Sequence, residues 1–393
     1  MSLLHTAFRQ LSARSAGLSL LSALIVAVPL LLTACGPATQ TNTTCGSPST
    51  GSSSASSSSH AVVGASGALA ALTGLSATTH NAAKASTTAS APTPVTLGLT
   101  YVPNIQFAPF YVAAAKGFYQ TAGLNVTLRH HGVGEDEFAS ISTGHEDAIF
   151  AGGDETMQAR SKGLPLVYVA NVFTKYPVTL IVPASSCIHS VADLKGHTIG
   201  VPGLYGATYI GLLALLQSAG LSPSSVHIQS VGYTQVSALL THKVDAVMGY
   251  INNEALQFQA AKFAIRTFTI PNPQPLVSNG LAVTQSELAQ HPDVVRALIA
   301  ATMQGVAYTI AHPQDAFNIS KQYVPGLGDS TQAATQMAVL QATQALWQIN
   351  VTQPGYNNPS TWQAMASFLQ KSGQLSGSVD ATQVYSNAYL PAK

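Results

Sequence analysis

The sequence predicts an α/β protein of two lobes, each a mainly parallel sheet flanked by helices. The chain has 393 residues, which is enough for two separate cores. From Val95 onward, strand-like and helix-like segments alternate, as is typical of parallel sheets covered on both faces. This alternation occurs in two sets, connected by strand-like segments at 176–183 and 280–285. We therefore expect the second lobe to be inserted into the first, with two crossover strands that act as a hinge.

The first set of segments runs from Val95 to the crossover strand at 176–183. Its helix at 109–122 begins with Pro109, which suits the first turn of a helix because its missing N–H is not needed there. The other elements follow from the alternation of apolar runs with polar turns. Strands are predicted at 95–100, 125–131, 147–152 and 166–173, and further helices at 135–143 and 154–162.

The second set of segments ends at the turn-forming sequence PNPQP, residues 271–275. From Glu287 onward the pattern is helical and is interrupted only by prolines. These changes place lobe 1 at 95–180 plus 278–393 and lobe 2 at 181–277. The predicted strands of lobe 2 are 197–203, 226–232, 245–250 and 264–270, its helices are 207–219, 234–242 and 253–262, and the later prolines are Pro292, Pro313, Pro325 and Pro359.

Residues 1–35 have the features of an export signal. Arg9 and Arg14 precede a near-continuous apolar run at 18–32. This run is shorter than the roughly 20 residues that a membrane-spanning helix needs, and it is typical of a signal peptide. The sequence LTAC then ends at Cys35, which matches the bacterial lipoprotein cleavage box. We expect Cys35 to become the lipid-bearing N-terminus; an ordinary secretory peptide is the alternative.

Residues 36–94 are predicted to be a disordered tether. They consist mostly of Ser, Thr, Ala and Gly, with Lys84 as the one charged residue. Such a segment buries too little apolar surface to offset its ordering entropy. The tether contains Cys45, and Cys187 lies in a predicted loop. Exported proteins can form disulfides, so a bridge between these two cysteines remains open.

The composition argues against a nucleic-acid partner. Charged residues make up 8% of the chain, compared with roughly a quarter in ordinary globular proteins. The formal net charge is +1, and no Lys/Arg cluster could track a phosphate backbone. The partner that fits this surface is small or uncharged overall.

The stretch 100–119 is the first predicted binding element. It leads from a strand through a polar and aromatic loop into a helix, and open α/β sheets place ligands at such positions. Aromatic side chains here offer flat faces, and the amides offer hydrogen-bond donors and acceptors. The residues selected in this loop are Tyr101, Asn104, Gln106 and Phe107.

Polar or aromatic residues recur at the ends of other predicted strands. The sequence GGDE follows one strand of the first lobe, PGLYGAT follows the first strand of the second, and YINNE follows a third. Helix capping explains some of these residues equally well, and an aromatic such as Tyr176 can instead belong to the core. The selected residues are Asp154, Glu155, Tyr176, Tyr205, Thr208, Tyr250, Asn252, Asn253 and Glu254.

Catalytic and metal-binding alternatives receive less support. No nucleophile elbow, P-loop, HExxH motif or dinucleotide fingerprint occurs in its required context. His130 and His131 precede the acidic run 135–137, but neighbouring residues of a strand point to opposite faces and do not easily share one ion. Lys116 and Lys195 lie in solvent-like contexts, so we expect surface positions for both. We predict no metal and no cofactor.

Four stretches together resemble a known family: residues 101–126, 151–170, 190–203 and 243–254. YVPNIQFAPFYVAAAKGFYQTAGLNV and KVDAVMGYINNE are the first and last of them. They are similar to the thiamine-precursor and alkanesulfonate group of periplasmic binding proteins, over roughly Val95–Ala316. The resemblance implies the type II periplasmic-binding-protein fold and delivery of a small-molecule ligand to the permease and ATPase subunits of an ABC importer.

The resemblance also bears on ligand, location and activity. PNIQFAPFY and YINNE look most like the branch that binds riboflavin or the thiamine pyrimidine precursors; alkanesulfonate or nitrate is the alternative. The implied protein is a monomer, lipid-anchored on the extracytoplasmic face of the cell membrane. The enzyme branch, the pyrimidine synthases, carries a cysteine-rich motif that Cys35, Cys45 and Cys187 do not reproduce, so we expect no enzyme activity. A ligand-free adhesin or sensor domain is a third hypothesis.

Overall fold

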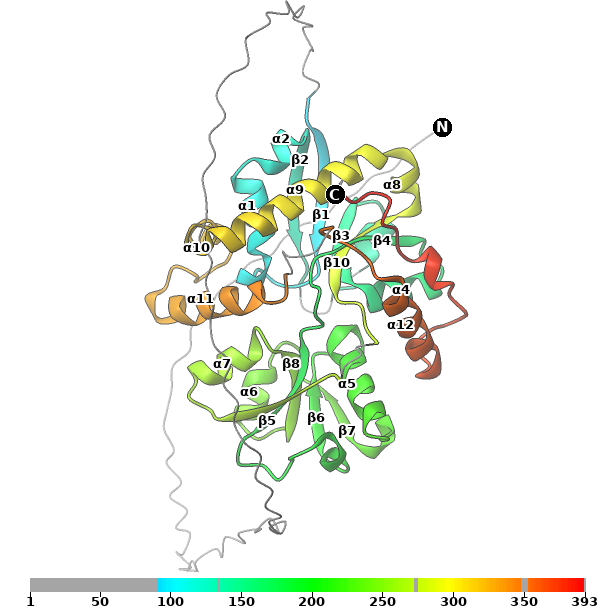
Figure 1. Cartoon of the computed structure of the whole chain (residues 1–393). Helices are drawn as coiled ribbons and strands as arrows, with labels where there is room; N and C mark the ends of the chain where they lie inside the picture. Colours follow the sequence, from blue (N-terminus) through cyan, green and yellow to red (C-terminus); the bar gives the residue numbers. More distant parts are fainter. Residues whose placement is uncertain (1–90, 133–134, 137, 272–274, 348–352, 392–393) are drawn as a thin grey trace, which may run out of the picture. The chain divides into compact units, whose positions relative to one another are not determined.

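The computed structural model describes residues 91–132, 135–136, 138–271, 275–347 and 353–391. The predicted signal segment with Cys35, and the tether up to residue 90, lie outside these residues. Within them the chain forms two separate sheets flanked by helices, which confirms the predicted α/β class (Figure 1). We call the unit around the first sheet lobe 1 and the unit around the second sheet lobe 2.

The sheet of lobe 1 has five strands in the order β2-β1-β3-β10-β4. Its strands β1, β2 and β3 pair in parallel, while β10 is antiparallel to both of its neighbours. Most of its strand residues are buried, as expected for a sheet covered on both faces. The bounds are β1 Thr93–Leu99, β2 Leu124–His130, β3 Ala148–Gly152, β4 Leu166–Asn171 and β10 Asn279–Thr284.

The sheet of lobe 2 repeats this pattern in the order β7-β6-β8-β5-β9. The strands β6, β7 and β8 are parallel, and β5 is antiparallel to β8 and β9. The bounds are β5 Val178–Pro183, β6 Thr198–Val201, β7 His227–Ser230, β8 Ala246–Tyr250 and β9 Ile265–Thr269.

The antiparallel strand of each sheet is the one that arrives from the other lobe. β5 is the first strand after the chain leaves lobe 1, and β10 is the first after it returns. The predicted boundary between residues 180 and 181 falls inside β5. Because Val178 already pairs with Tyr250 of β8, the whole of β5 belongs to the second sheet.

Two of the helices predicted for lobe 1 differ from the structure. The helix expected at 109–122 is divided at Gly117, which has a φ of 71° and separates α1 (Ala108–Ala115) from α2 (Phe118–Thr121). The helix expected at 135–143 is reduced to α3 (Ala139–Ser142) among the described residues. Glu135 and Asp136 therefore lie in a loop rather than at a helix start. The short helix η1 (Ile105–Phe107) precedes α1, and α4 spans Gly153–Ser161.

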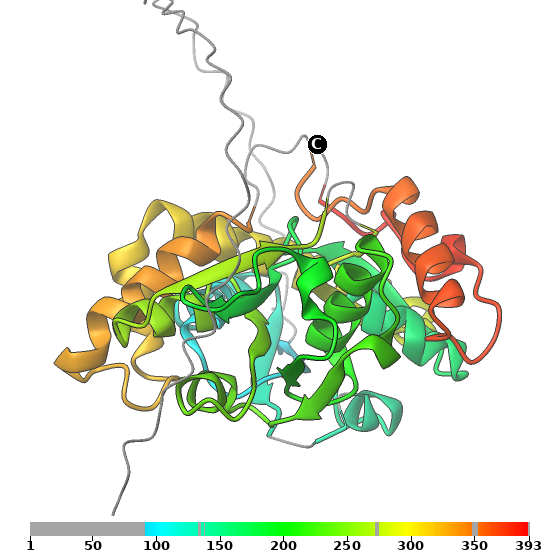
Figure 2. The same ribbon diagram turned by 90° about the horizontal axis from the view of Figure 1, so that it is seen from below.

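The helical C-terminal part of the chain covers lobe 1. Figure 1 shows α9 running across α1. In Figure 2 the helices α11 and α12 lie on opposite sides of the view. By length and composition α9 could cross a membrane, but 44% of its apolar window is buried in this fold, as in a core helix. The bounds are α8 Gln285–Gln290, α9 Pro292–Ala311, α10 Pro313–Ser320, α11 Ser330–Gln344 and α12 Pro359–Lys371; the helices of lobe 2 are α5 Gly206–Ser218, α6 Gln235–Leu240 and α7 Glu254–Ala260.

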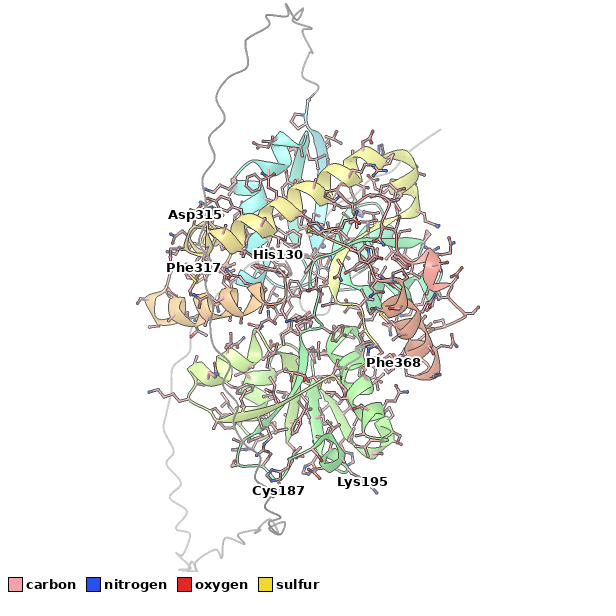
Figure 3. The ribbon with its side chains drawn as sticks, viewed as in Figure 1. His130, Cys187, Lys195, Asp315, Phe317 and Phe368 are labelled. Atoms are coloured by element: carbon pink, nitrogen blue, oxygen red, sulfur yellow. The ribbon has the colours of Figure 1, made fainter. Side chains whose placement is uncertain are left out.

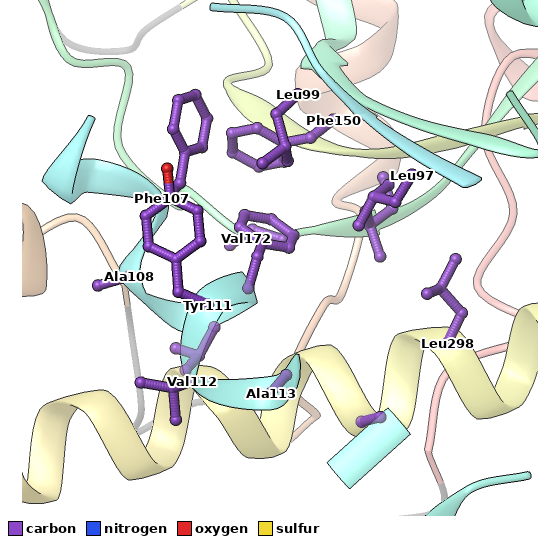
Figure 4. Packing of buried hydrophobic residues seen from close by; sticks show 14 of the residues in the cluster. Leu97, Leu99, Phe107, Ala108, Tyr111, Val112, Ala113, Phe150, Val172 and Leu298 are labelled. Atoms are coloured by element: carbon purple, nitrogen blue, oxygen red, sulfur yellow. The ribbon is translucent and has the colours of Figure 1, made fainter. Parts of the chain in front are cut away.

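The core of lobe 1 forms between its sheet and the helices α1 and α9. In Figure 4, Tyr111 and Val112 of α1 lie between Leu99 of β1 and the helix α9. All three of these side chains are fully buried. Burying a side chain of this size contributes about 1.5–3 kcal/mol, so this contact fixes α1 and the loop before it.

The positions of two lysines confirm the surface placement predicted for them. Lys195 is exposed and lies at the periphery of lobe 2 (Figure 3), and Lys116 is exposed at the end of α1. Neither lysine lies in a cavity lining described below. Cys187 is disulfide-bonded, whereas Cys45 lies outside the described residues.

Gly305 of α9 provides a test of the packing between α9 and α1. A Cβ atom at this position would lie 2.3 Å from the carbonyl oxygen of Pro109 and 3.0 Å from Cβ of Ala113. Gly305→Ala should therefore lower the free energy of unfolding by about 1–3 kcal/mol, although alanine favours helices by about 1 kcal/mol over glycine. Urea denaturation measures this change. Gly328→Ala is the control, because a Cβ there meets open space; equal stability of the two variants would contradict the packing described here.

Candidate functional site

A cavity of about 110 Å³ lies where the strand ends of both lobes meet. This volume is several times the roughly 10–15 Å³ that one buried water needs, so the cavity can accept part of a small molecule. Its walls are aromatic rings, amides and two carboxyl groups. The lining residues are Thr100, Tyr101, Gln106, Phe107, Phe150, Glu155, Phe173, Pro202, Tyr205, Gly206, Ala207, Thr208, Tyr233, Gln235, Tyr250, Asn253, Glu254 and Asn279.

The loop between β1 and α1 forms the wall from lobe 1. Tyr101, Gln106 and Phe107 line the cavity as the sequence predicts. Asn104 is not among the lining residues. Its side-chain oxygen instead accepts a hydrogen bond from the backbone N–H of Gln106 at 3.0 Å, which caps η1. Asn104 thus fixes the loop, and its neighbours face the cavity.

Helix starts form the wall from lobe 2. Tyr205 and Thr208 line the cavity at the start of α5, and Tyr250, Asn253 and Glu254 line it at the start of α7. Tyr205 is 51% exposed, so its ring lies at the rim. Glu254 is buried, and its carboxylate accepts a hydrogen bond from the backbone N–H of Tyr250 at 2.7 Å. This bond holds Tyr250 against the start of α7.

Asp154 and Tyr176 are fully or almost fully buried and do not line the cavity. The Tyr176 hydroxyl lies 2.6 Å from Oδ2 of Asp154 and 2.8 Å from the carbonyl oxygen of Ala207. Asp154 lies in the first turn of α4 in lobe 1, and Ala207 lies in the first turn of α5 in lobe 2. The two residues selected from the sequence as ligand contacts therefore join the lobes behind the cavity wall.

Asn252 has a similar place on the other side of the cavity. It is buried, and its side-chain N–H group donates to Oε1 of Gln106 at 2.7 Å and to Oγ1 of Thr343 at 2.9 Å. Gln106 and Thr343 both belong to lobe 1. Asn252, selected from the sequence as a ligand contact, thus joins the lobes and is not among the lining residues, while its partner Gln106 lines the cavity.

Several lining residues were not selected from the sequence. Tyr233 and Gln235 follow β7 and open α6, so they occupy the same strand-to-helix position that identified Tyr205 and Tyr250. The ring of Tyr233 contacts the ring of Tyr101 edge-on, with 4.6 Å between centroids. The strand-to-helix rule that selected Tyr205 and Tyr250 could therefore also have selected Tyr233 and Gln235 from the sequence. Phe150, in contrast, lies in the middle of β3 and Asn279 is the first residue of β10, so neither has the strand-to-helix signal.

The cavity is electrostatically negative or neutral. None of its described lining residues is Lys, Arg or His. Burial raises the pKa of the Glu254 carboxyl. Burial, together with the nearby Glu254 and Tyr233, also raises the pKa of the Tyr101 hydroxyl. Each of these groups is therefore biased toward its uncharged form, which can donate a hydrogen bond.

His130 and His131 make separate contacts. His130 contacts the Tyr111 hydroxyl at 2.9 Å and the Tyr101 carbonyl oxygen at 3.1 Å, and burial lowers its pKa. His131 instead contacts Glu146 at 2.8 Å. Among the described residues, no group of three or more His, Cys, Asp or Glu side chains is placed to hold a metal ion.

The two-sheet architecture with crossover strands is the periplasmic-binding-protein fold. The alkanesulfonate-binding protein SsuA from Xanthomonas axonopodis pv. citri, bound to MOPS, superimposes with a TM-score of 0.61 and 17% identity. The match covers 76% of this chain and 100% of that one. At this identity the similarity establishes the fold alone, and it confirms the fold predicted from the sequence.

The chain belongs to the family described as NMT1/THI5 like, which matches residues 104–316. The riboflavin-binding protein RibY from Chloroflexus aurantiacus is 34% identical over 304 residues, covering 76% of this chain and 86% of RibY. A 4-amino-5-hydroxymethyl-2-methylpyrimidine phosphate synthase from Legionella pneumophila is 24% identical, covering 76% and 92%. The family resemblance seen in the sequence is confirmed, and of these two relatives one is named a binding protein and the other a synthase.

The buried Asp154 gives the protein a pH-dependent stability. Burial, with the neighbouring Glu155 carboxylate, raises the pKa of Asp154 to about 7. The folded state therefore holds this proton more tightly than the unfolded state. The contribution of Asp154 to stability is full below its ordinary pKa near 4 and is lost as the pH rises through the raised value.

Urea denaturation between pH 4 and pH 8 tests this linkage. Asp154→Asn should reduce the fall in unfolding free energy with rising pH, because the variant has no proton to lose at this position. Asp329→Asn is the control at an exposed site. Parallel stability profiles for the wild type and Asp154→Asn would contradict the assignment.

Proposed function

We propose that this protein is the extracytoplasmic solute-binding component of an ABC importer and that it captures a flat heteroaromatic nutrient between its lobes. The observation that carries the proposal is the cavity itself, where Tyr101 and Phe107 from lobe 1 meet Tyr233 and Tyr250 from lobe 2. Rings supply flat faces, and Gln106, Gln235, Asn253 and Asn279 supply hydrogen-bond donors and acceptors.

Riboflavin is the first ligand candidate, followed by a thiamine pyrimidine precursor. A wide tricyclic ring suits an aromatic lining drawn from both lobes, and RibY, the relative at 34% identity, is named for riboflavin binding. A formylaminopyrimidine-binding protein from Halalkalibacterium halodurans, 27% identical over 227 residues, keeps the smaller ring as the second candidate. A ligand that contacts both lobes favours the closed arrangement by its differential affinity for it.

We further propose that the protein is not an enzyme. The described cavity lining includes no Cys and no Lys, so it offers neither a thiolate nucleophile nor an amine for a covalent cofactor bond. The proposed partners are the permease and ATPase subunits, and the proposed state is a monomer. Incubation of the purified protein with riboflavin or pyridoxal phosphate should leave each compound unchanged in mass; conversion of either would refute the binding-only role.

Ligand binding is tested with the purified protein. Riboflavin should raise the melting temperature and lose fluorescence on binding, since stacking against aromatic rings quenches a flavin. Tyr250→Ala should weaken this binding about tenfold, because a lost aromatic contact costs about 1.4 kcal/mol. Tyr356→Ala is the control; Tyr356 is 47% exposed and is not among the lining residues.

The outcomes of this experiment separate the alternatives. A shift with hydroxymethylpyrimidine but not riboflavin selects the second candidate. No shift with riboflavin, hydroxymethylpyrimidine or thiamine would overturn the heteroaromatic assignment. Equal affinity of Tyr250→Ala and the wild type would show that the start of α7 does not contact the ligand.

Membrane attachment through Cys35 is a separate proposal, supported by the LTAC sequence after the apolar run. In a bacterial host that processes lipoproteins, the wild type should fractionate with membranes and incorporate labelled palmitate. Cys35→Ser should incorporate no label and leave the membrane fraction if it is cleaved elsewhere. Cys45→Ser is the matched control and should keep the label; loss of label in this variant instead would refute the assignment to Cys35.

A further inference from the structure

The start of α5 in lobe 2 is a place where an anionic ligand group would ordinarily bind. The first N–H groups of a helix lack intrahelical partners and carry partial positive charge. The N-cap residue of α5 is Tyr205, whose side chain makes no capping hydrogen bond. Gly206, Ala207 and Thr208 of the first turn all line the cavity. Nothing from the helix itself therefore satisfies these donors.

A carboxylate from lobe 1 takes this position instead. Oε1 of Glu155 accepts a hydrogen bond from the backbone N–H of Ala207 at 3.0 Å. Its other oxygen, Oε2, accepts from the backbone N–H of Gly152 at 2.7 Å, at the start of α4. Glu155 is 6% exposed and lines the cavity. One buried carboxylate thus bridges the starts of two helices that belong to different lobes.

The rest of the cavity offers an anion no positive charge. The second carboxyl group of the lining belongs to the buried Glu254 and is biased toward its uncharged form, and no lining residue among those described is cationic. The nearby ring of His130, 5.3 Å from that of Phe107, is biased toward neutrality by burial. An anionic group entering the cavity would meet the Glu155 carboxylate at low dielectric and would find no positive charge in exchange.

We propose that Glu155 is a specificity-determining residue: it acts as a built-in anion at the start of α5 and restricts the cavity to ligands without a negative charge. This inference rests on the solute-binding role proposed above and narrows its ligand class. Uncharged heteroaromatic compounds are admitted. Their phosphate esters, and sulfonates of the kind for which the structurally similar SsuA is named, are rejected.

The test compares an uncharged ligand with its charged derivative. Riboflavin, riboflavin 5′-phosphate and butanesulfonate are titrated against the purified protein by calorimetry. The wild type should bind riboflavin at least a hundredfold more tightly than its phosphate ester and should not bind butanesulfonate. Glu155→Gln keeps the shape of the side chain and removes its charge, so it should reduce the riboflavin preference to below tenfold.

Two further variants keep the result interpretable. Glu155→Ala frees the first N–H groups of α5 and should gain affinity for butanesulfonate. This variant also replaces Glu155→Gln as the test if Glu155→Gln does not fold. Glu287→Gln removes the same charge at the start of α8, outside the cavity lining, and should leave every affinity unchanged.

The experiment distinguishes a failure of the proposed charge selection from a failure of the proposed ligand assignment. If hydroxymethylpyrimidine binds and riboflavin does not, the ligand candidate changes and the charge selection stands, provided that the anions are still rejected. Binding of either anion by the wild type within tenfold of the best uncharged ligand overturns the proposal. A failure of the anions to gain affinity in the folded Glu155 variants overturns it as well.

Discussion

The junction between the starts of α4 and α5 is the contact on which the site depends. Glu155 of lobe 1 accepts a hydrogen bond from the backbone N–H of Ala207 in lobe 2. The Tyr176 hydroxyl connects Asp154 of lobe 1 to the carbonyl oxygen of the same Ala207. Buried carboxyl groups are costly unless they are hydrogen-bonded, so this cluster is stable only with both lobes in place. On the other side of the cavity, Asn252 joins Gln106 in the same way. These polar contacts between the lobes are satisfied within the protein itself. The aromatic side chains of the lining therefore stay available to a ligand.

The cavity lies at this junction because of the way in which the chain crosses between the sheets. Each crossing delivers one antiparallel strand into an otherwise parallel sheet, β5 into lobe 2 and β10 into lobe 1. The parallel strands β1, β3, β6, β7 and β8 then end toward the cavity, followed by loops or helix starts that line it. Binding at the carboxyl ends of parallel strands is a general property of open α/β sheets. Here two such edges share one cavity.

Charge is the property by which this cavity differs most clearly from an anion site. The fold accommodates a sulfonate-binding protein among its structural neighbours, and a relative at 24% identity is named a synthase. What distinguishes members of one fold is the set of side chains at the strand ends. In this chain those positions supply Glu155 and Glu254, aromatic rings and amides, without a cationic residue among the described lining. The scaffold is common to these proteins, and the ligand class is set locally.

The sequence by itself determined the α/β class, the two sets of elements and half of the lining residues, because period, turn residues and strand-end polarity are local properties. Nine of the selected residues line the cavity, Tyr101, Glu155, Tyr205 and Tyr250 among them. The tertiary structure decided the rest. It turned Asn104 into a cap, placed Asn252, Asp154 and Tyr176 between the lobes, and added Phe150 and Asn279 from apolar strands. The same polar residue types at helix starts can cap a helix, join the lobes or contact a ligand. Which of these a residue does depends on the position of its partner atom, and that position is set by the tertiary structure.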